Sequence, residues 1–564
     1  MLPLVSAEQM RLLDADTISR LGVPGAVLME NAGRGVVEVL WRLHCEGSLD
    51  LYRARVVVLA GPGNNGGDGS VIARALHGQG VCVRLHVCAD RARVRGDARL
   101  HLLAAEAAGV PLYECAGEAE VSQLALLLQG LGSGDLIVDA LFGTGLHKAL
   151  RGPMAQLVFA ANSSAARRVA IDLPSGLDAD IGRPADAEDD PSPAIVRADY
   201  TVTFGFPKLG LLGAPGFTWA GTVFLVDIGI PDPSSGGHAV RARLLDVRCL
   251  LRLSQPRSQL GHKGTHGHVL ILAGSIGKTG AALLCTRAAL RTGVGLCTLA
   301  APHDVVEHAL SGQVLEAMSW PYRLPSTDDT GRAQDLETQW LQAAQGKQAI
   351  AVGPGLPVSP HIKHALCSLI EQGTAPMVLD ADALNQLVGE EARLLRARQR
   401  GRDLILTPHP GEAARLLGST VRHVQANRYD SARRLCQRTG AVVVLKGART
   451  VVVSPQPAAG SIPPLDALPL SLCPTGNSGM GTGGMGDVLA GIVAALLTAG
   501  WPAYDAACAA VYWHGRAGDW LVTQRAAGSL LCAGDLIDAL DPVRAHVVAE
   551  CERPPQPTWP ITRL

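Results

Sequence analysis

The chain has 564 residues, with 50 Lys and Arg against 51 Asp and Glu, so its formal net charge is −1. This balance excludes a broadly basic surface for nucleic acid or for an anionic membrane, because both depend on clustered positive charge. Hydrophobic residues make up 47% and charged residues 18%, which is too apolar for a disordered chain. The 64 glycines and only 4% aromatic residues favour parallel α/β sheets with many tight turns.

The cysteines and the N-terminus indicate a reducing compartment. None of the 13 cysteines forms a CxxC pair, so we expect reduced thiols rather than structural zinc or a disulfide framework. The opening residues, MLPLVSAEQM, contain no basic segment followed by an apolar core, which a signal peptide requires. The longest uncharged apolar run, Val488 to Gly500, is shorter than the ~20 residues of a membrane span. We therefore expect a cytoplasmic enzyme with no membrane segment.

Short apolar strands occur in two blocks along the chain. The first block runs from 55–63 to 222–229 and the second from 268–275 to 442–447, with helix-like sequence between the strands. Runs that are apolar on both faces are typical of central strands in parallel sheets. The sequence therefore predicts two α/β domains, 1–230 and 255–545, with a linker at 231–254 and a loose tail at 546–564.

Glycine-rich and acidic segments follow the strands of the first block. GPGNNGGDG at 61–69 precedes a helix, and its glycines allow backbone N–H groups to approach an anion at the helix N-terminus. Asp139 and Asp172 follow two further strands; a single acid in such a place usually caps a helix. Together, however, Asn65, Asp139 and Ser175 offer the oxygen ligands that a hard cation takes. Parallel strands bring these loops to one edge, where we expect a ligand site.

Five motifs of this first region resemble, in order, the YjeF N-terminal family of NAD(P)HX epimerases. They are MENAG (29–33), GNNGGDG (63–69), VDALFGTG (138–145), IDLPSGLDAD (171–180) and VTFGFPKLGLL (202–212). The resemblance covers about 1–230 and implies a Rossmann-like three-layer fold. It also implies epimerisation between the R and S forms of hydrated NADH or NADPH.

The same resemblance assigns roles to particular residues. It makes Asp172 the candidate acid/base, because a carboxylate beside the nicotinamide can assist ring opening and reclosure at C6. It implies a potassium ion held by Asn65, Asp139 and Ser175. The implied substrate contacts are Asn64, Asn65, Gly66, Gly67, Asp68, Gly143, Thr144, Gly145, Leu146, His147, Lys148, Ala149 and Asp172.

Two features near the start of the second block resemble well-known sites but fail on spacing. Gly274 to Thr279 looks like a P-loop, yet GxxxxGK[ST] requires glycine at the position that Leu272 occupies. We interpret the segment as a glycine-rich turn. His262, His266 and His268 have no acid or cysteine at a useful spacing, so we expect no metal site there.

The strongest signal is the glycine-rich loop 477–487, which ends at Asp487 and runs into the apolar helix VLAGIVAALL. Successive N–H groups at a helix N-terminus stabilise a phosphoryl group in transit. An aspartate at the end of such a loop can take the proton of an attacking hydroxyl. The simpler alternative, a helix cap at Asp487, explains the aspartate but not so many glycines.

This loop resembles the anion-hole helix of the ribokinase-like superfamily. With HKGTHGHVLILAGS, GPGL (353–356), LDADALN (379–385), LTPHPGE (406–412) and LKGART (445–450), it resembles the YjeF C-terminal family of ADP/ATP-dependent NAD(P)HX dehydratases, over about 255–545. The resemblance implies a ribokinase-like three-layer fold and use of ADP or ATP with Mg²⁺. Implied substrate contacts are Ala281, Gly355, His409 and the catalytic Asp487; implied nucleotide contacts are Lys446, Gly447, Ala448, Arg449, Thr450 and Gly486. Met485 stands where many relatives have threonine, but its backbone N–H is unchanged.

The favoured interpretation is a bifunctional repair enzyme that epimerises NADHX and NADPHX and then dehydrates the S form, with ADP as the favoured nucleotide and AMP and phosphate as products. One alternative is a small-molecule kinase of the pyrimidine or thiazole type with a non-catalytic N-terminal module. Another makes the first domain a non-catalytic ligand-binding or scaffold module. LTPHPGE and LKGART argue against the kinase, and the set Asn65, Asp139, Asp172 and Ser175 against an inactive first domain. Relatives of the dehydratase suggest a homo-oligomer, for which a tetramer is one form.

Overall fold

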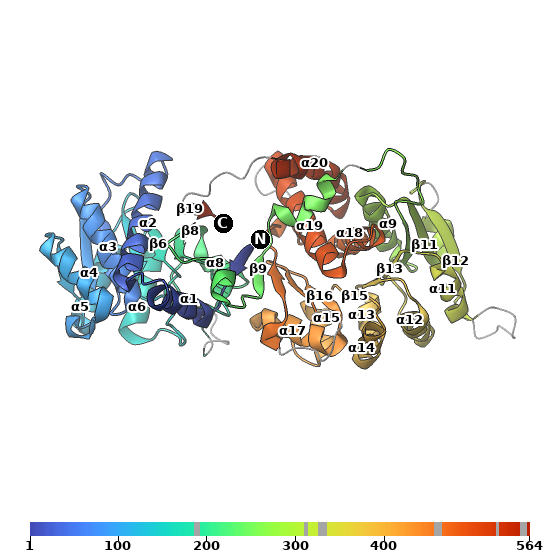
Figure 1. The fold of residues 1–564 in the computed structure, drawn as a ribbon, viewed down its shortest axis with the longest axis horizontal. Helices are drawn as coiled ribbons and strands as arrows, with labels where there is room; N and C mark the ends of the chain where they lie inside the picture. The colour runs from blue at the N-terminus through green and yellow to red at the C-terminus, as the bar shows by residue number, and fades with distance from the viewer. Residues whose placement is uncertain are drawn as a thin grey trace. The chain divides into compact units, whose positions relative to one another are not determined.

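The computed structural model describes the chain except for residues 185, 187–191, 256, 310–313, 325–334, 456–464, 526–529 and 553–560. The chain divides into two compact units. The first contains 3–242 and 555–564, and the second contains 243–554 and 1–2. Each unit has a largely parallel sheet between layers of helices, which confirms the predicted α/β class with three-layer domains (Figure 1).

The first unit has an eight-stranded sheet in the order β19-β8-β7-β6-β5-β2-β3-β4. Strands β8 to β4 are parallel, while β19 is antiparallel to β8. The central strands β2 and β5 are buried along their whole length, as their runs of apolar residues require. The bounds are β2 (Val56–Ala60), β3 (Val83–Val87), β4 (Leu112–Glu114), β5 (Leu136–Ala140), β6 (Arg167–Ile171), β7 (Tyr200–Phe204), β8 (Thr222–Val226) and β19 (Ile561–Arg563).

Alternate strand residues of the first unit face two separate helix layers. Val56, Val58 and Ala60 pack with α1 (Ala7–Ser19), α2 (Gly25–Cys45), α3 (Asn64–Gly78) and α4 (Gly96–Ala107). Val57 and Leu59 pack with α5 (Glu118–Gln129) and α6 (Gly152–Ser163) on the other face. The short helices α7 (Leu209–Leu212) and α8 (Phe217–Ala220) lie between β7 and β8 in the chain.

The second unit has an eleven-stranded sheet in the order β1-β9-β18-β17-β16-β15-β14-β13-β10-β11-β12. The strands from β12 to β16 are parallel, and β17 and β18 continue the sheet in antiparallel pairing. The bounds are β1 (Leu2–Leu4), β9 (Ala242–Leu244), β10 (His268–Leu272), β11 (Leu296–Pro302), β12 (Met318–Tyr322), β13 (Ala349–Val352), β14 (Met377–Leu379), β15 (Leu404–Leu406), β16 (Val442–Leu445), β17 (Val451–Val453) and β18 (Leu470–Leu472).

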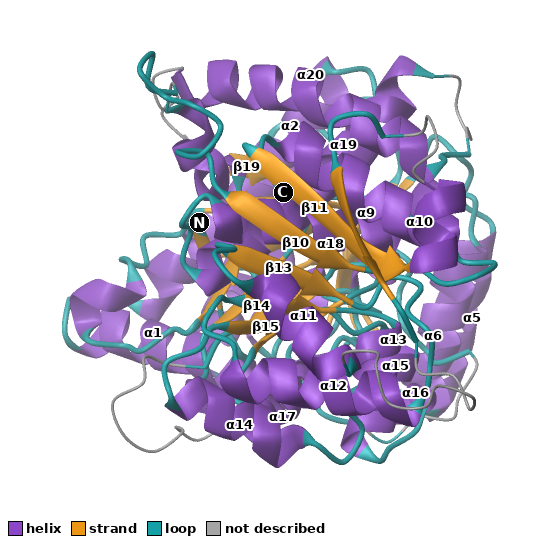
Figure 2. Ribbon diagram, turned by 90° about the vertical axis from the view of Figure 1, so that its right-hand side faces the viewer, coloured by secondary structure: helices purple, strands orange, loops and turns teal. Residues whose placement is uncertain are grey.

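Helices cover both faces of this sheet (Figures 1 and 2). One face packs in a single apolar cluster with α9 (Thr279–Thr292), α18 (Met485–Thr498), α19 (Ala503–Gln524) and α20 (Ala533–Glu552). The other face carries α11 (Leu336–Ala344), α12 (Pro360–Gln372), α14 (Glu391–Gln399), α15 (Pro410–Leu417) and α17 (Arg428–Thr439). Shorter helices are α10 (His303–Ala309), α13 (Asp382–Gln386) and α16 (Val421–Ala426). Helix α18 contains most of the apolar run at 488–500 and is almost entirely buried.

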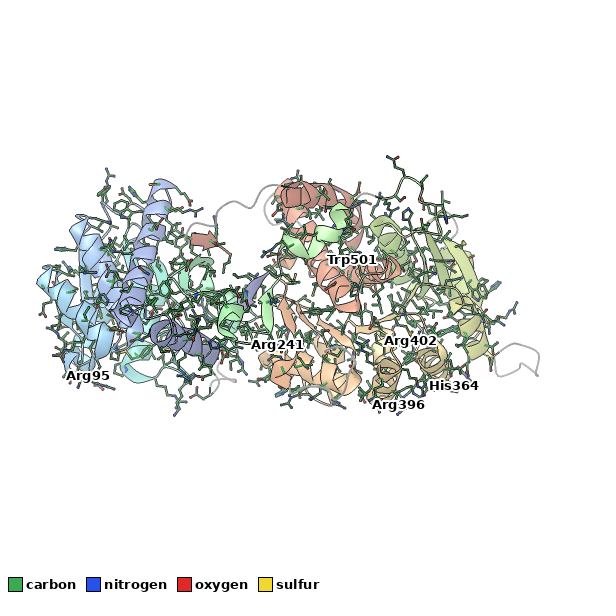
Figure 3. The ribbon with its side chains drawn as sticks, in the orientation of Figure 1. Arg95, Arg241, His364, Arg396, Arg402 and Trp501 are labelled. Atoms are coloured by element: carbon green, nitrogen blue, oxygen red, sulfur yellow. The ribbon has the colours of Figure 1, made fainter. Side chains whose placement is uncertain are left out.

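The segments expected to link and to end the domains are more ordered than the sequence suggested. Residues 231–254 include β9 and a 3₁₀ helix (Val247–Ser254) whose Leu250 is buried. In that helix the guanidinium of Arg252 lies 4.8 Å from the ring centroid of Trp501, which is labelled in Figure 3.

The prediction of a loose tail at 546–564 is wrong for two of its segments. Helix α20 continues to Glu552 with Val547 fully buried, and β19 pairs with β8. Backbone hydrogen bonding to an edge strand orders β19, which sequence periodicity over three residues does not reveal. Residues 553–560 of this tail lie outside the described residues.

Two further expectations concern the membrane and the cysteines. In the part of the chain that the structure describes, no helix is both long and apolar enough to cross a membrane. The cysteines whose side chains are described are all free, and most of them are buried.

Candidate active sites

A cavity of about 690 Å³ lies at the carboxyl ends of the strands in the first unit. Its walls come from α1, the first turns of α2 and α3, the loop after β5, and single residues after β6 and β7. Apolar side chains such as Leu28, Phe142 and Phe204 line it beside several carboxyl groups. A mostly apolar cavity with a few polar groups is typical of a small-molecule site.

Asp172 and Lys208 form a buried ion pair in this cavity. Lys208 Nζ lies 2.5 Å from Asp172 Oδ1 and also donates to the Phe204 carbonyl at 3.0 Å. Thr203 Oγ1 donates to the same Asp172 oxygen at 3.1 Å, and the Lys208 side chain is only 1% exposed. Asp172 has φ +66°, a left-handed conformation that non-glycine residues rarely adopt. The carboxylate is therefore held in one position by a strained backbone and by two donors.

Neither Lys208 nor Thr203 stands out as a site residue in the sequence. Both lie within VTFGFPKLGLL, which was quoted as one motif of the resemblance. The motif does not show which residue Lys208 pairs with, because Asp172 follows a different strand.

Asn65 lines this cavity, whereas Asp139 and Ser175 lie behind its lining and are joined to it through Phe142, whose N–H donates to Ser175 Oγ at 2.9 Å. Asp139 is fully buried; Oδ1 accepts from Ser175 Oγ at 2.6 Å and Oδ2 from Ser175 N at 2.8 Å. Burial raises the pKa of Asp139 to about 6, against the hydrogen bonds from Ser175. The side-chain oxygen and nitrogen of Asn65 are buried without a hydrogen-bond partner among the described residues. Buried polar atoms without partners indicate a site for a polar ligand or ion.

Two further carboxyl groups line the cavity with altered proton affinity. Burial raises the pKa of Asp68 well above its usual value, and the Asp172 charge adds to the effect. Burial also raises the pKa of Asp14, on α1, to about 6, with Lys208 acting in the opposite direction. The sequence did not identify Asp14, because its position fits the polar face of an amphipathic helix.

The structure brings together most of the predicted contacts of the first site. Asn64, Asn65, Asp68, Asp172 and the loop 143–147 all line the cavity. Gly66 and Gly67 lie in the first turn of α3, packed against the Gly61 backbone and the Met29 side chain. Lys148 is exposed, and Ala149 N donates to Asp186 Oδ1 at 2.7 Å; neither is among the lining residues.

In the second unit, Asp487 lies in the first turn of α18. The helix begins after Gly484, which has φ +89° and provides no side-chain cap. Its first N–H groups are thus available to an anion. Partly buried His514 has its Nε2 3.0 Å from the Met485 carbonyl oxygen, and burial lowers the pKa of His514 to about 4. Asp519 accepts from Gly476 N at 2.9 Å and from Asn477 Nδ2 at 3.0 Å, which fixes the start of the loop.

Carboxyl groups surround Asp487 and Lys446. Burial raises the pKa of Asp487 to about 6; Asp380 adds to this effect and Lys446 opposes it. Lys446 Nζ lies 2.5 Å from Asp380 Oδ1 and 4.0 Å from Glu412 Oε2. Burial lowers the pKa of Lys446, but these carboxylates outweigh burial and the net shift is upward. A Cβ added at Gly486 would lie 3.2 Å from Lys446 Nζ, so the lysine reaches the helix N-terminus.

The remaining predicted contacts follow neighbouring strands at the same edge. A Cβ added at Gly355, after β13, would lie 3.2 Å from the Ala281 Cβ of α9. His409, after β15, caps α15; its Nδ1 accepts from Gly411 N at 3.0 Å and its Nε2 lies 3.3 Å from Glu412 Oε1. Burial lowers the pKa of His409.

Residues 446–450 connect β16 to β17. Arg428 donates to the Lys446 carbonyl at 3.1 Å, and Thr450 Oγ1 donates to the Gly447 carbonyl at 3.0 Å. Arg449 has φ +54° and donates to the Pro474 carbonyl at 2.7 Å, with Ala448 beside it in the turn. Five of the predicted nucleotide contacts thus form one ordered connection, and the sixth, Gly486, lies in α18 beside Lys446.

The P-loop-like segment forms a turn, as its spacing predicted. Lys278 N donates to the Ser275 carbonyl in a turn, and Ser275 Oγ donates to the Gly355 carbonyl at 2.7 Å. Lys278 Nζ lies 2.8 Å from Asp382 Oδ2. Within the described ranges, no group of three or more His, Cys, Asp and Glu residues is arranged to hold a metal ion.

The fold and the sites define a class of α/β protein with two candidate ligand sites. The first is a cavity that contains Asp172, and the second is the glycine-rich N-terminus of α18, with Asp487 and Lys446 beside it. The YjeF-related protein N-terminus model matches residues 25–210, and the NAD(P)H-hydrate dehydratase model matches 269–540. The chain is 39% identical to the bifunctional NAD(P)H-hydrate repair enzyme of Moorella thermoacetica, covering 97% of this chain and 98% of that one. It is 35% identical to that of Escherichia coli, covering 95% and 92%. The chain belongs to the bifunctional NAD(P)H-hydrate repair enzyme family.

One solved structure similar to the second unit is the ADP/ATP-dependent NAD(P)H-hydrate dehydratase of Bacillus subtilis, co-crystallised with ATP and Mg²⁺. It is 28% identical, with a TM-score of 0.43, and the match covers 55% of this chain and 100% of that chain.

Proposed function

We propose that this protein repairs hydrated NADH and NADPH in two steps. The first site epimerises the R and S hydrates, and the second dehydrates the S hydrate with an adenine nucleotide, ADP being favoured. One observation supports the proposal above all: a single chain carries both the Asp172–Lys208 pair in a cavity and Asp487 at an uncapped helix N-terminus. Membership of the family agrees with both activities.

In the first site, Asp172 acts as acid/base at C6 of the hydrated nicotinamide. Lys208 keeps the Asp172 carboxylate in place, and the Asp172 oxygens face the loop at Gly143, where a Cβ would lie 3.4 Å from Oδ2. Asn64, Asn65, Asp68 and residues 143–147 line the space for the nucleotide. Lys148 and Ala149 follow in the same loop, and we assign them to the substrate as well.

A potassium ion beside the first site would be held by Asn65, Asp139 and Ser175. The fit rests on the buried Asn65 amide oxygen, which has no hydrogen-bond partner among the described residues, and on the buried Asp139 carboxylate with its Ser175 partner. Oxygen donors of mixed charge suit a hard cation. Once bound, the ion supplies positive charge that neutralises Asp139 and orders the loop after β5. Asn65→Leu should remove the increase in thermal stability that K⁺ gives over a large organic cation.

In the second site, Asp487 takes the proton of the C6 hydroxyl, whose oxygen then attacks the terminal phosphorus of ADP or ATP. The bond from that phosphorus to the bridging oxygen breaks, which releases AMP from ADP. N–H groups from Gly484 to Gly486 stabilise the transferring oxygens, with Lys446 beside them. The nitrogen lone pair of the ring expels phosphate from C6, and loss of a proton from C5 restores the double bond of NAD(P)H.

The nucleotide and substrate occupy neighbouring parts of this edge. We assign Lys446, Gly447, Ala448, Arg449, Thr450 and Gly486 to the adenine nucleotide and Ala281, Gly355, His409 and Asp487 to the hydrate. Mg²⁺ bound with the nucleotide supplies charge neutralisation for its phosphates.

A coupled assay tests the two activities separately. R and S hydrates are mixed with ADP or ATP, and NADH absorbance is followed. Complete recovery from both hydrates is expected in the wild type. Asp172→Asn should recover only the S form, and Asp487→Asn should recover neither while still interconverting R and S. A stable phosphorylated alcohol as end product would instead identify a kinase.

Cellular and assembly properties complete the proposal. We place the enzyme in the cytoplasm, where its substrates form and where its free cysteines remain reduced. We expect a homo-oligomer, for which a tetramer is one form. Light scattering of the purified protein measures the second point, and a mass equal to one chain would contradict it.

A further inference from the structure

Helix α1 closes one wall of the first cavity and carries a carboxyl group without an assigned role. Asp14 lines the cavity together with Asp172 and Lys208. We propose that Asp14 is the second proton-transfer residue of this site, acting on the ring nitrogen while Asp172 acts on the C6 hydroxyl. This inference rests on the proposed epimerase function.

The position of α1 over the cavity is fixed at its N-terminus. Ser6 and Gln9 form a capping box, and Ala7 N donates to Asp180 Oδ1 at 2.7 Å. The preceding residue, Val5, pairs with the segment at Lys208: its N–H donates to the Pro207 carbonyl at 3.1 Å and its carbonyl accepts from Leu209 N at 3.1 Å. The segment that positions Lys208 thus also positions the helix that carries Asp14.

The Asp14 carboxyl group differs from the neighbouring carboxyl groups in its lack of protein partners among the described residues. Among the described residues, its carboxyl group makes no hydrogen bond and no salt bridge, whereas Asp172 is bound by Lys208 and Thr203 and Asp180 by the α1 backbone. Burial raises the pKa of Asp14 to about 6, Lys208 opposes this shift, and Asp172 adds to it. The other charged or titratable groups lining the cavity are Glu8, Arg11, Asp68, Asp97 and His147.

Epimerisation through ring opening requires a base and an acid at neighbouring atoms. Asp172 takes the hydroxyl proton, a C6=O bond forms, and the C6–N1 bond breaks with its electron pair moving to N1. The Asp14 carboxylic acid gives its proton to N1, which leaves an open-chain aldehyde. After rotation about C5–C6, N1 returns its proton to Asp14 and attacks the opposite face, and the oxygen recovers a proton from Asp172. No other reactant is consumed.

The reaction therefore needs two proton-transfer groups that reach the ring from different walls of the cavity. Asp172 follows β6 and Asp14 lies on α1, so they approach a bound ring from different elements. A general acid or base typically contributes about 10²–10⁴-fold to a rate. An unpartnered carboxyl group with a pKa near neutrality suits this role, because it can both give and recover a proton.

The test is Asp14→Asn in the full-length protein, with Asp16→Asn as matched control. Asp16 lies on the same helix, in an exposed ion pair with Arg20, and does not line the cavity. Purified R hydrate is supplied, and its conversion to S is followed by chromatography without nucleotide. Dehydration of S by the same chain reports whether the second unit is folded, and thermal unfolding reports whether the first unit is.

We expect Asp14→Asn to lower kcat for epimerisation about 100-fold or more, with KM within about threefold and dehydration unchanged. The wild-type kcat should fall as pH rises above the pKa of Asp14, and the variant should lack this limb. Asp14→Glu, which keeps the acid, should restore part of the rate. If the wild type converts R but Asp14→Asn does so within threefold of it, the role of Asp14 is refuted. If the wild type itself fails to convert R, the epimerase proposal fails instead.

Discussion

Lys446 and Asp380 form a buried ion pair in the second site, with Nζ 2.5 Å from Oδ1 and side chains only 17% and 1% exposed. A second lysine–aspartate pair, Lys278 and Asp382, lies at the same edge at 2.8 Å, but its side chains are 53% and 17% exposed. The two pairs have the same chemistry and similar length. They differ in burial, and burial decides how much the loss of one partner changes the free energy of unfolding.

Asp380→Asn should therefore destabilise the second unit much more than Asp382→Asn. Removal of one partner of a buried pair leaves an uncompensated charge and costs about 3–5 kcal/mol, whereas an exposed pair contributes about 0–1 kcal/mol. Glu412 Oε2, 4.0 Å from Lys446 Nζ, offsets part of the loss. Urea denaturation of the two variants checks this, and equal effects would contradict it. Dehydration should fall in Asp380→Asn, because Lys446 is no longer fixed beside Gly486.

The dehydration rate should depend on the ionisation of Asp487. The base acts only as a carboxylate, and burial raises its pKa to about 6. The value of kcat/KM should consequently rise with pH through about 6 and level off above it. The pH–rate profile of the wild type measures this limb, and Asp172→Asn, altered only in the other site, should show the same profile.

The raised pKa of Asp487 also lowers stability at high pH. Its pKa is about 6 when folded, against 3.8 as a free side chain, so the folded state binds extra protons between about pH 4 and 6. Stability from this group is accordingly lost as pH rises through that window. At pH 8, Asp487→Asn should unfold at a higher urea concentration than the wild type, with a free energy of unfolding larger by about 3 kcal/mol, and the two should not differ below pH 4. A variant equally or less stable at pH 8 would contradict the assignment.

Close packing of α18 against α9 sets a steric requirement at Gly491. A Cβ there would collide with the Cys285 carbonyl oxygen and lie 3.1 Å from Ala289 N. Gly491→Ala should cost about 1–3 kcal/mol and slow dehydration, because α18 carries Asp487. Gly534→Ala is the control: it lies in α20 with no atom within 4 Å of an added Cβ and should be neutral or stabilising by about 0.4–1 kcal/mol. Thermal unfolding distinguishes the two.

Much of the fold followed from patterns within short stretches of sequence. The buried strands β2, β5 and β10 are continuous apolar runs, and the residues after such strands include Asp172 and His409, as expected for the carboxyl edge of a parallel sheet. Local patterns predicted the elements and the loops that carry chemistry.

What escaped prediction depends on contacts between distant segments. Lys208 and Asp380 lie inside recognised motifs, but their partners come from other strands, so nothing in the motifs distinguished a buried ion pair from an exposed charge. Asp14 follows the polar spacing of a surface helix, and only the tertiary position of α1 places it in a cavity. Strand β19 has three residues and pairs with β8 from the far end of the chain.

Strand β19 is translated last but completes the sheet of the first unit. The sheet of the first unit ends in residues 561–563, so translation of residues 3–242 alone leaves the backbone of β8 without its antiparallel neighbour. An unpaired edge of this kind invites association with other chains. We therefore expect an excised fragment of residues 3–242 to be less stable and more prone to associate than the same residues in the full protein.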